Sequence, residues 1–137
     1  MTGEFAVAVH ALVFLDHKRT TQNSEALAEN ICTNPARVRK VMAKLKKAGL
    51  VATKEGADGG YLLLADAAAI DLAQVFAAVE SRVVAAGWRS GDEDMDCLIA
   101  AGMANIMDDI YADLDALCKE RLSRITIAAI EQRIFGG

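Results

Sequence analysis

The position of the only proline, Pro35, predicts where one helix of this chain begins. The preceding residue, Asn34, can cap a helix with its side-chain oxygen, and proline fits the first helical position because its missing N–H is not needed there. Gly49 supplies a stop at the other end. We therefore expect a helix over residues 35–48, preceded in the sequence by a shorter helix that is capped by Ser24.

Positive charge is concentrated on this predicted helix, although the whole chain carries 15 Lys and Arg against 19 Asp and Glu. From Arg37 to Lys54 there are seven basic residues and no acidic one. At about 100° per residue, four basic residues of the helix fall within an arc of about 80°, and an apolar face lies about 145° away. The basic arc comprises Arg37, Lys40, Lys44 and Lys47, and the apolar face comprises Val38, Met42 and Leu45. One face therefore suits a protein core and the other a polyanion.

A strand, a glycine-rich turn and a second strand are expected directly after the helix, over residues 50–64. Three glycines lie within residues 56–60 of this stretch and permit positive φ in the turn. A short helix, a tight connection, a cationic second helix and this two-stranded wing predict a winged helix-turn-helix, whose second helix enters the DNA major groove. A solubilising surface helix is the alternative explanation of the basic face.

An apolar stripe predicts a long helix in the C-terminal part of the chain. Its members recur at spacings of 4, 3, 4, 4 and 3, and they are Ile99, Met103, Ile106, Ile110, Leu114 and Leu117. This is the period of one helix face, sustained over about five turns. A chain of 137 residues has few other elements to cover such a stripe, so we expect a dimerisation helix.

The expected fold class is mainly α with a small β-wing, and the chain divides into four parts. Residues 1–82 form a winged helix-turn-helix DNA-binding domain and 83–96 a linker, followed by a dimerisation helix over 97–120 and a C-terminal helix over 121–137 that returns to the winged domain. Residues 67–137 carry twelve acidic and six basic residues, so the acidity belongs to the half that is not expected to face phosphates.

Several classes of function are excluded by what the sequence lacks. No apolar run reaches the roughly 20 residues of a membrane span, and we interpret the apolar N-terminal stretch as a buried helix of a cytoplasmic protein rather than a signal peptide. No set of catalytic side chains and no phosphate-binding glycine loop before a helix is present, so an enzyme is not expected. The three cysteines are far apart, which favours free thiols in a reducing compartment.

Four stretches of the sequence resemble one family. They are AVAVHALVFL, SEALAENICTNPARVRKVMAKLKKAGLV, KEGADGGYLLLA and IDLAQVFAAVE. In this order the chain resembles the Rrf-two family of bacterial transcription regulators, which includes IscR, NsrR and CymR. The resemblance implies a homodimer that binds double-stranded DNA as a sequence-specific regulator, and we expect a repressor. Its operator would be roughly palindromic, with half-sites about one helical turn, or a multiple, apart.

The resemblance also implies which residues contact DNA. The N-terminal part of the helix over residues 35–48 would reach base edges and phosphates, and the wing would approach the minor groove. The expected DNA-binding residues are Thr33, Asn34, Arg37, Arg39, Lys40, Lys44, Lys54, Gly59 and Gly60. The wing of the family typically carries an arginine where this chain has Glu55, and Lys54 beside it could substitute.

The cysteines depart from the family pattern. Cluster-binding members carry three closely spaced cysteines before the dimer helix, whereas this chain has only Cys97 there. An iron–sulfur cluster usually needs four thiolate-type ligands, so we expect no cofactor, and no Cys and His spacing fits a zinc site. Cys118 follows the last residue of the stripe and is interpreted as a small packing residue.

A redox switch is a hypothesis for the other two cysteines. In the family the dimer helix reaches the winged domain of the other subunit, so Cys97 of one chain could approach Cys32 of its partner. A disulfide between them would shift the recognition helices. The helix start near Cys32 and Arg37 would favour a thiolate at Cys32, whereas the acidic residues over 92–96 would oppose one at Cys97. Inert thiols are the alternative.

Two further alternatives remain open. A winged-helix domain can serve as a protein-interaction module without sequence-specific DNA binding, its basic helix docking an acidic partner. A small-molecule effector could also bind between the domains, at a site lined by Trp88, Arg89, Met95 and Met103.

Overall fold

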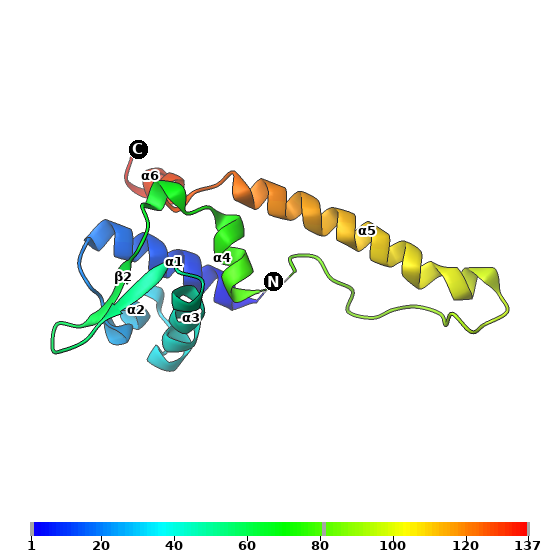
Figure 1. Ribbon diagram of the computed structural model, residues 1–137, viewed down its shortest axis with the longest axis horizontal. Helices are drawn as coiled ribbons and strands as arrows, with labels where there is room; N and C mark the ends of the chain where they lie inside the picture. The colour runs from blue at the N-terminus through cyan, green and yellow to red at the C-terminus, as the bar shows by residue number, and fades with distance from the viewer. Residues whose placement is uncertain (1, 81, 137) are drawn as a thin grey trace.

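The computed structural model describes residues 2–80 and 82–136, which form a winged domain and a long projecting helix (Figure 1). In chain order the elements are α1 (Gly3–Lys18), α2 (Ser24–Ile31), α3 (Pro35–Lys47), β1 (Val51–Lys54), β2 (Gly60–Leu63), the 3-10 helix η1 (Ala67–Ala69), α4 (Leu72–Val79), α5 (Leu98–Ser123) and α6 (Ile127–Phe135). The expected fold class, mainly α with a small β-wing, is confirmed. Within the described residues, no helix is both long enough and apolar enough to cross a membrane.

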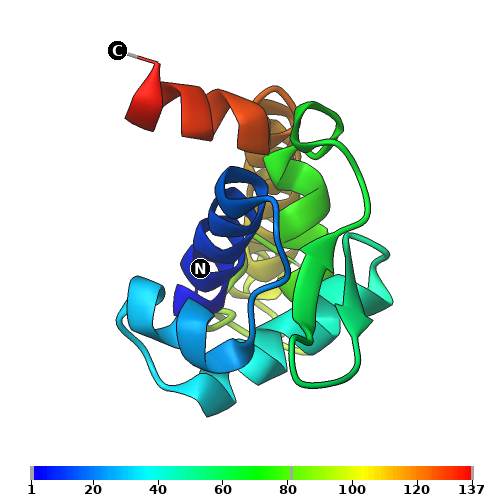
Figure 2. The ribbon, with the colours of Figure 1, turned by 90° about the vertical axis from the view of Figure 1, so that its left-hand side faces the viewer.

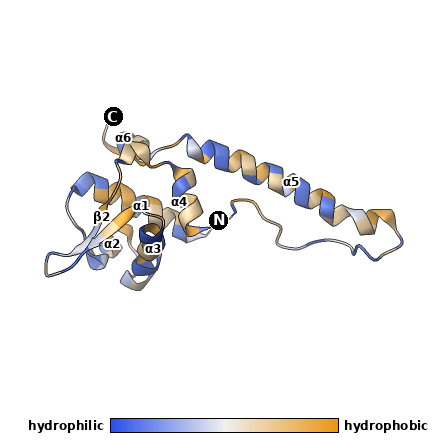
Figure 3. Cartoon of the chain, viewed as in Figure 1, coloured by the Kyte–Doolittle hydropathy of each residue, from blue (hydrophilic) through white to orange (hydrophobic). Residues whose placement is uncertain are grey.

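Helix α1 lies at the centre of the winged domain, with α2, α3, the wing and α6 around it (Figure 2). Its inward side chains, such as Leu12, are fully buried against the apolar residues of α2 and α3. The predicted apolar face of α3 is in this core, because Val38, Met42 and Leu45 are all inaccessible to solvent. In the hydropathy colouring α3 is predominantly hydrophilic on its outer side, whereas α1 is largely hydrophobic (Figure 3).

Helix α1 extends beyond the apolar N-terminal stretch from which it was predicted. It continues through the polar residues to Lys18 and ends at Arg19, whose φ of 57° is left-handed and whose amide donates to the Leu15 carbonyl. The last turn contacts α6, since the His17 ring stacks on Phe135 with centroids 4.1 Å apart. The left-handed cap at Arg19 and this contact with α6 both act on the polar last turn.

The wing is an antiparallel pair in which Val51 lies opposite Leu63 and Lys54 opposite Gly60. The link between α1 and α2 adds a further bridge, because the Tyr61 amide donates to the Gln22 carbonyl at 2.8 Å and the Tyr61 carbonyl accepts from the Gln22 amide at 3.1 Å. Gly60 is required at this crossing, because its φ is 152° and an added Cβ would collide with the Gln22 carbonyl. The wing is therefore fixed to the start of the helix-turn-helix.

The chain between α4 and α5, residues 82–97, runs back along α5 to its far end (Figure 1). We call it the return segment. The Asp115 carboxylate accepts from the amides of Val83 and Val84, and the Asp92 amide donates to the Ala100 carbonyl at 3.0 Å. The stretch expected as a loop contains no regular helix or strand among its described residues, but it is packed along α5 rather than free.

After α5 the chain turns back to the winged domain. The Leu72 amide donates to the Ile125 carbonyl at 2.8 Å, and the Ile127 amide donates to the Ile70 carbonyl at 2.9 Å. Thr126 caps α6 by accepting from the Ala129 amide, and Ile127 is fully buried. The C-terminal helix is thereby joined to the beginning of α4.

Candidate DNA-binding surface

Helices α2 and α3 are joined by a tight turn with the local geometry that the sequence predicts. The Asn34 side chain accepts from the Arg37 amide at 2.8 Å, and Pro35 occupies the first turn of α3. The cap of α2 is Asn23, whose side chain accepts from the Ala26 amide at 2.8 Å, so the prediction of Ser24 as the cap was wrong by one residue. Cys32 closes α2 in a left-handed conformation with φ of 64°. With the wing after it, this unit is a winged helix-turn-helix with α3 as its second helix.

The predicted DNA-contacting residues of α3 lie mainly on its solvent side. Asn34, Arg37, Arg39 and Lys40 are exposed, while Thr33 and Lys44 are half-buried. Arg39 lies 3.8 Å from the Glu25 carboxylate of α2 and 3.4 Å from the Ser24 hydroxyl, and it remains half-exposed. The surface is therefore cationic and in part internally paired.

A residue that the sequence reasoning missed, Glu4, faces the basic arc of α3. Its carboxylate lies 2.7 Å from Nζ of Lys44 and 3.1 Å from Nζ of Lys40. Lys44, followed by Lys40, holds the pKa of Glu4 below its usual value. The Arg37 guanidinium lies against Gly3, so a Cβ added there would require the end of the Arg37 side chain to move. Because α1 and α3 are far apart in sequence, no local pattern predicts these contacts.

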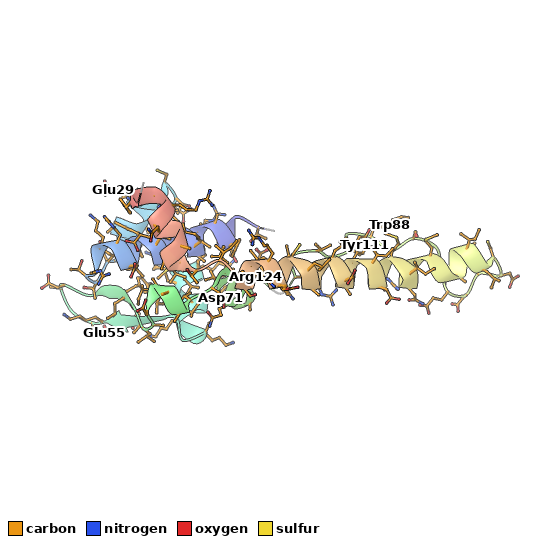
Figure 4. All side chains as sticks on the ribbon, turned by 90° about the horizontal axis from the view of Figure 1, so that it is seen from above. Glu29, Glu55, Asp71, Trp88, Tyr111 and Arg124 are labelled. Atoms are coloured by element: carbon orange, nitrogen blue, oxygen red, sulfur yellow. The ribbon has the colours of Figure 1, made fainter. Side chains whose placement is uncertain are left out.

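The wing carries the remaining predicted residues. Lys54 ends β1 and is exposed, and Glu55 lies at the outer edge of the wing (Figure 4). Gly59 and Gly60 are half-buried, and an added Cβ at Gly59 would collide with the Lys54 carbonyl. The two glycines thus have a structural role in shaping the wing, whatever they contact on DNA.

The apolar stripe of α5 is open to solvent on a single chain. Its exposed fractions run from 39% at Met103 to 70% at Ile99. The return segment covers another face of α5, where Ala104 and Asp115 are buried. A compact monomer of 14.6 kDa is expected to expose about 6,900 Å², whereas this chain exposes 8490 Å². The excess, roughly 1,600 Å², belongs to an elongated chain in which α5 projects from the winged domain (Figure 1).

The return segment and α5 border an open hollow of about 860 Å³. Trp88 and Tyr111 line it together, and Figure 4 shows them on the same side of α5. Arg89 crosses its edge to Asp108, with Nη2 and Oδ2 2.7 Å apart. Of the residues suggested for an effector site, Trp88, Arg89 and Met103 line an adjoining hollow of about 280 Å³, whose lining does not include Met95.

All three cysteines are free thiols, and Cys32 and Cys97 are exposed. Cys97 precedes α5, and the backbone amides of Ala100 and Ile99 lower the pKa of its thiol. The sequence predicted the opposite influence at Cys97 from the neighbouring acidic residues. The amides at the helix start act in the other direction and favour the thiolate.

The structure combines a winged helix-turn-helix with a long helix that carries an open apolar stripe, an architecture that suits a DNA-binding transcriptional regulator. The chain belongs to the Rrf-two (Rrf2) family, whose sequence model, described as an iron-dependent transcriptional regulator, matches residues 1–133. The resemblance noted from the sequence motifs is thereby confirmed, as is the expectation that the chain is not an enzyme.

Individual relatives agree with this assignment. The HTH-type transcriptional regulator IscR of Vibrio vulnificus is 29% identical over 128 residues, which cover 93% of this chain and 73% of that protein. A crystal structure from Lactobacillus plantarum has a TM-score of 0.86 at 25% identity, covering 98% of this chain and 91% of the other. CymR of Bacillus subtilis, named as the global cysteine regulator, shares the fold with a TM-score of 0.73 at 17% identity, over 97% of this chain and 96% of CymR.

The iron in the family description can be compared with the donor atoms of this chain. An iron–sulfur cluster usually takes four thiolate-type ligands. Cys118 lies about 31 Å along α5 from Cys97 at 1.5 Å per residue, and Cys32 lies in the winged domain. Within residues 2–80 and 82–136, no three His, Cys, Asp or Glu side chains are grouped so as to hold a metal ion. The donors of one chain therefore do not fit such a cluster.

Proposed function

We propose that this protein is a homodimeric, sequence-specific regulator of transcription, a repressor that acts in the cytoplasm on a roughly palindromic operator. The open stripe of α5 carries the proposal. Its side chains, from Ile99 to Leu117, lie on one face of a helix of about 39 Å and are exposed on a single chain. A second copy would bury the same stripe, in the two-fold arrangement that is commonest among soluble oligomers.

In this dimer each α3 would enter one major groove. Thr33, Asn34, Arg37 and Arg39, near its N-terminal end, would reach bases and phosphates, and Lys40 and Lys44 would add positive charge along the helix. Lys54, Gly59 and Gly60 of the wing would approach the minor groove. The cationic side chains on the solvent side of α3 support this placement, because clustered Lys and Arg release counterions from DNA when they neutralise its phosphates.

We further propose that the protein works without the three-cysteine cluster and responds to oxidants through Cys32 and Cys97. The two thiols would form one disulfide between chains, giving two protons and two electrons to a peroxide, which is reduced to water or to an alcohol and water. Two observations support this proposal: both sulfurs are exposed, and the pKa of the Cys97 thiol is lowered. Within one chain α2 and the start of α5 lie at opposite ends (Figure 1), so the bridge requires two chains.

One experiment tests the proposed function as a whole. Sequences bound by the protein are selected from a random pool of double-stranded DNA, with reduced and peroxide-treated protein in parallel. We expect an enriched palindrome with half-sites about 10 base pairs, or a multiple, apart. The amount of bound DNA should differ between the reduced and the peroxide-treated protein. Absence of any enriched sequence would favour a protein-interaction module. An equal response in Cys32→Ser would contradict the disulfide.

A further inference from the structure

The first turn of α1 lies against most of the basic arc of α3. Glu4 contacts Lys40 and Lys44, and Gly3 contacts Arg37, so three of the four residues in the arc face this turn. The Glu4 side chain is only 16% exposed, whereas that of Lys40 is 67% exposed. A nearly enclosed carboxylate is therefore held beside lysines that still reach solvent.

The negative charge of Glu4 persists at neutral pH. Hydrogen bonds from Lys44 and then Lys40 hold its pKa below the usual value of 4.5. A group with a lowered folded pKa keeps its ionic contacts at all pH values above the ordinary one and loses them only as pH falls further. Under the conditions in which the protein would meet DNA, Glu4 is always ionised.

We propose that Glu4 is an internal competitor of the DNA phosphates and limits the affinity of α3 for DNA. The inference rests on the proposed function, in which α3 meets the phosphate backbone. A lysine ammonium has three donors, and Glu4 occupies one donor of each of the two lysines. Its charge, a few ångströms from where a phosphate would be held, also repels that phosphate.

A second role is compatible with the same contacts and predicts the opposite result. If Glu4 served only to orient Lys40 and Lys44 for phosphates, its removal would weaken DNA binding. If Glu4 competes, its removal strengthens binding and increases the number of counterions released. Each phosphate that is neutralised contributes about −0.9 to the slope of log K against log salt, so the slope separates the two roles.

The test compares wild-type protein with Glu4→Gln by fluorescence anisotropy. The probe is a labelled mixed-sequence duplex of about 30 base pairs, titrated between about 50 and 200 mM NaCl. We expect Glu4→Gln to bind about fivefold to tenfold more tightly, with a slope more negative by about 1 to 2. Unchanged or weaker binding at an unchanged slope would overturn the proposal.

Two controls make the result specific. Glu120→Gln removes the same charge from the Glu120–Arg124 pair on α5, away from α3, and should leave the slope unchanged. In a Lys40→Gln, Lys44→Gln background, Glu4→Gln should give no gain, because the competing lysines are gone. A gain that persists there would contradict the proposal. If wild-type protein shows no salt-dependent binding, the proposed function fails instead, and thermal unfolding of each variant verifies that it is folded.

Discussion

The Asp115 carboxylate, buried near the middle of α5, accepts a hydrogen bond of 2.6 Å from the backbone amide of Val83. The Val84 amide donates to the same oxygen at 2.9 Å, and Lys119 pairs with the other oxygen at 2.9 Å. Asp115 thereby fastens the return segment to one face of α5. The apolar stripe on another face stays exposed, as the proposed dimer requires.

Replacing Asp115 with Ala should release the return segment. The change leaves the amides of Val83 and Val84 without an acceptor. They can form hydrogen bonds with water only if the segment moves away from α5, so its release is favoured. We expect cleavage within residues 82–97 by a nonspecific protease to become several times faster, while the winged domain stays resistant. Equal cleavage in the Asp113→Ala control and in Asp115→Ala would show that Asp115 does not anchor the segment.

Acid should release the same segment in wild-type protein. The Val84 amide, followed by Lys119, lowers the pKa of Asp115 below its usual 3.8. Because the folded pKa is the lower one, the stabilising contribution is complete above about pH 4 and is lost as pH falls through the folded value. Trp88, the only tryptophan, lies on the segment and reports its mobility by fluorescence anisotropy. We expect the fluorescence anisotropy of Trp88 to decrease only below about pH 4. The Asp115→Asn variant should show no such acid transition.

A charge in the stripe should dissociate the proposed dimer. Ile106→Glu would place a carboxylate in an apolar contact without a partner, at a cost of several kcal/mol. Analytical ultracentrifugation should show a monomer at concentrations where wild-type protein is a dimer. Ala116→Glu, an exposed position of α5 outside the stripe, is the matched control and should remain dimeric. A monomeric wild-type protein would contradict the stripe as an interface.

The capping hydrogen bond of α3 should contribute measurably to the free energy of unfolding. Asn34→Ala removes the acceptor of the Arg37 amide and should lower the free energy of unfolding by about 1 kcal/mol. Asn34→Asp retains a carboxylate oxygen that can cap and should remain near the wild-type value. Urea denaturation followed by circular dichroism compares the three proteins. If Asn34→Ala and Asn34→Asp lost the same amount of stability, the missing capping hydrogen bond would not be the cause of the loss.

Gly60 should be intolerant of a side chain. Gly60→Ala combines left-handed strain with a collision against the Gln22 carbonyl, and we expect a loss of about 2–3 kcal/mol in the free energy of unfolding. Gly87→Ala, which has open space around it and no positive φ, should change stability little. If both variants unfold at the same urea concentration as wild-type protein, the wing does not depend on this close approach.

Much of the fold was predictable because its signals are local. The cap at Asn34, the first-turn proline and the apolar period of α3 each act within a few residues, and the structure agrees with them. The stripe from Ile99 to Leu117 is equally local, since a helix places every third or fourth residue on one face. The end of α1 was not predictable, because α6 stabilises its polar last turn from the other end of the chain.

By itself, the sequence determined the helix-turn-helix, the wing and the apolar stripe, because short-range periodicity and capping specify them. Only the tertiary structure decided which charges meet. Glu4 lies 40 residues from Lys44 in the chain, and Asp115 lies 32 from Val83. Neither pair follows from spacing, because the packing of α1 on α3 and of the return segment on α5 brings each pair together. The electrostatics of the basic helix α3 was therefore settled by the fold.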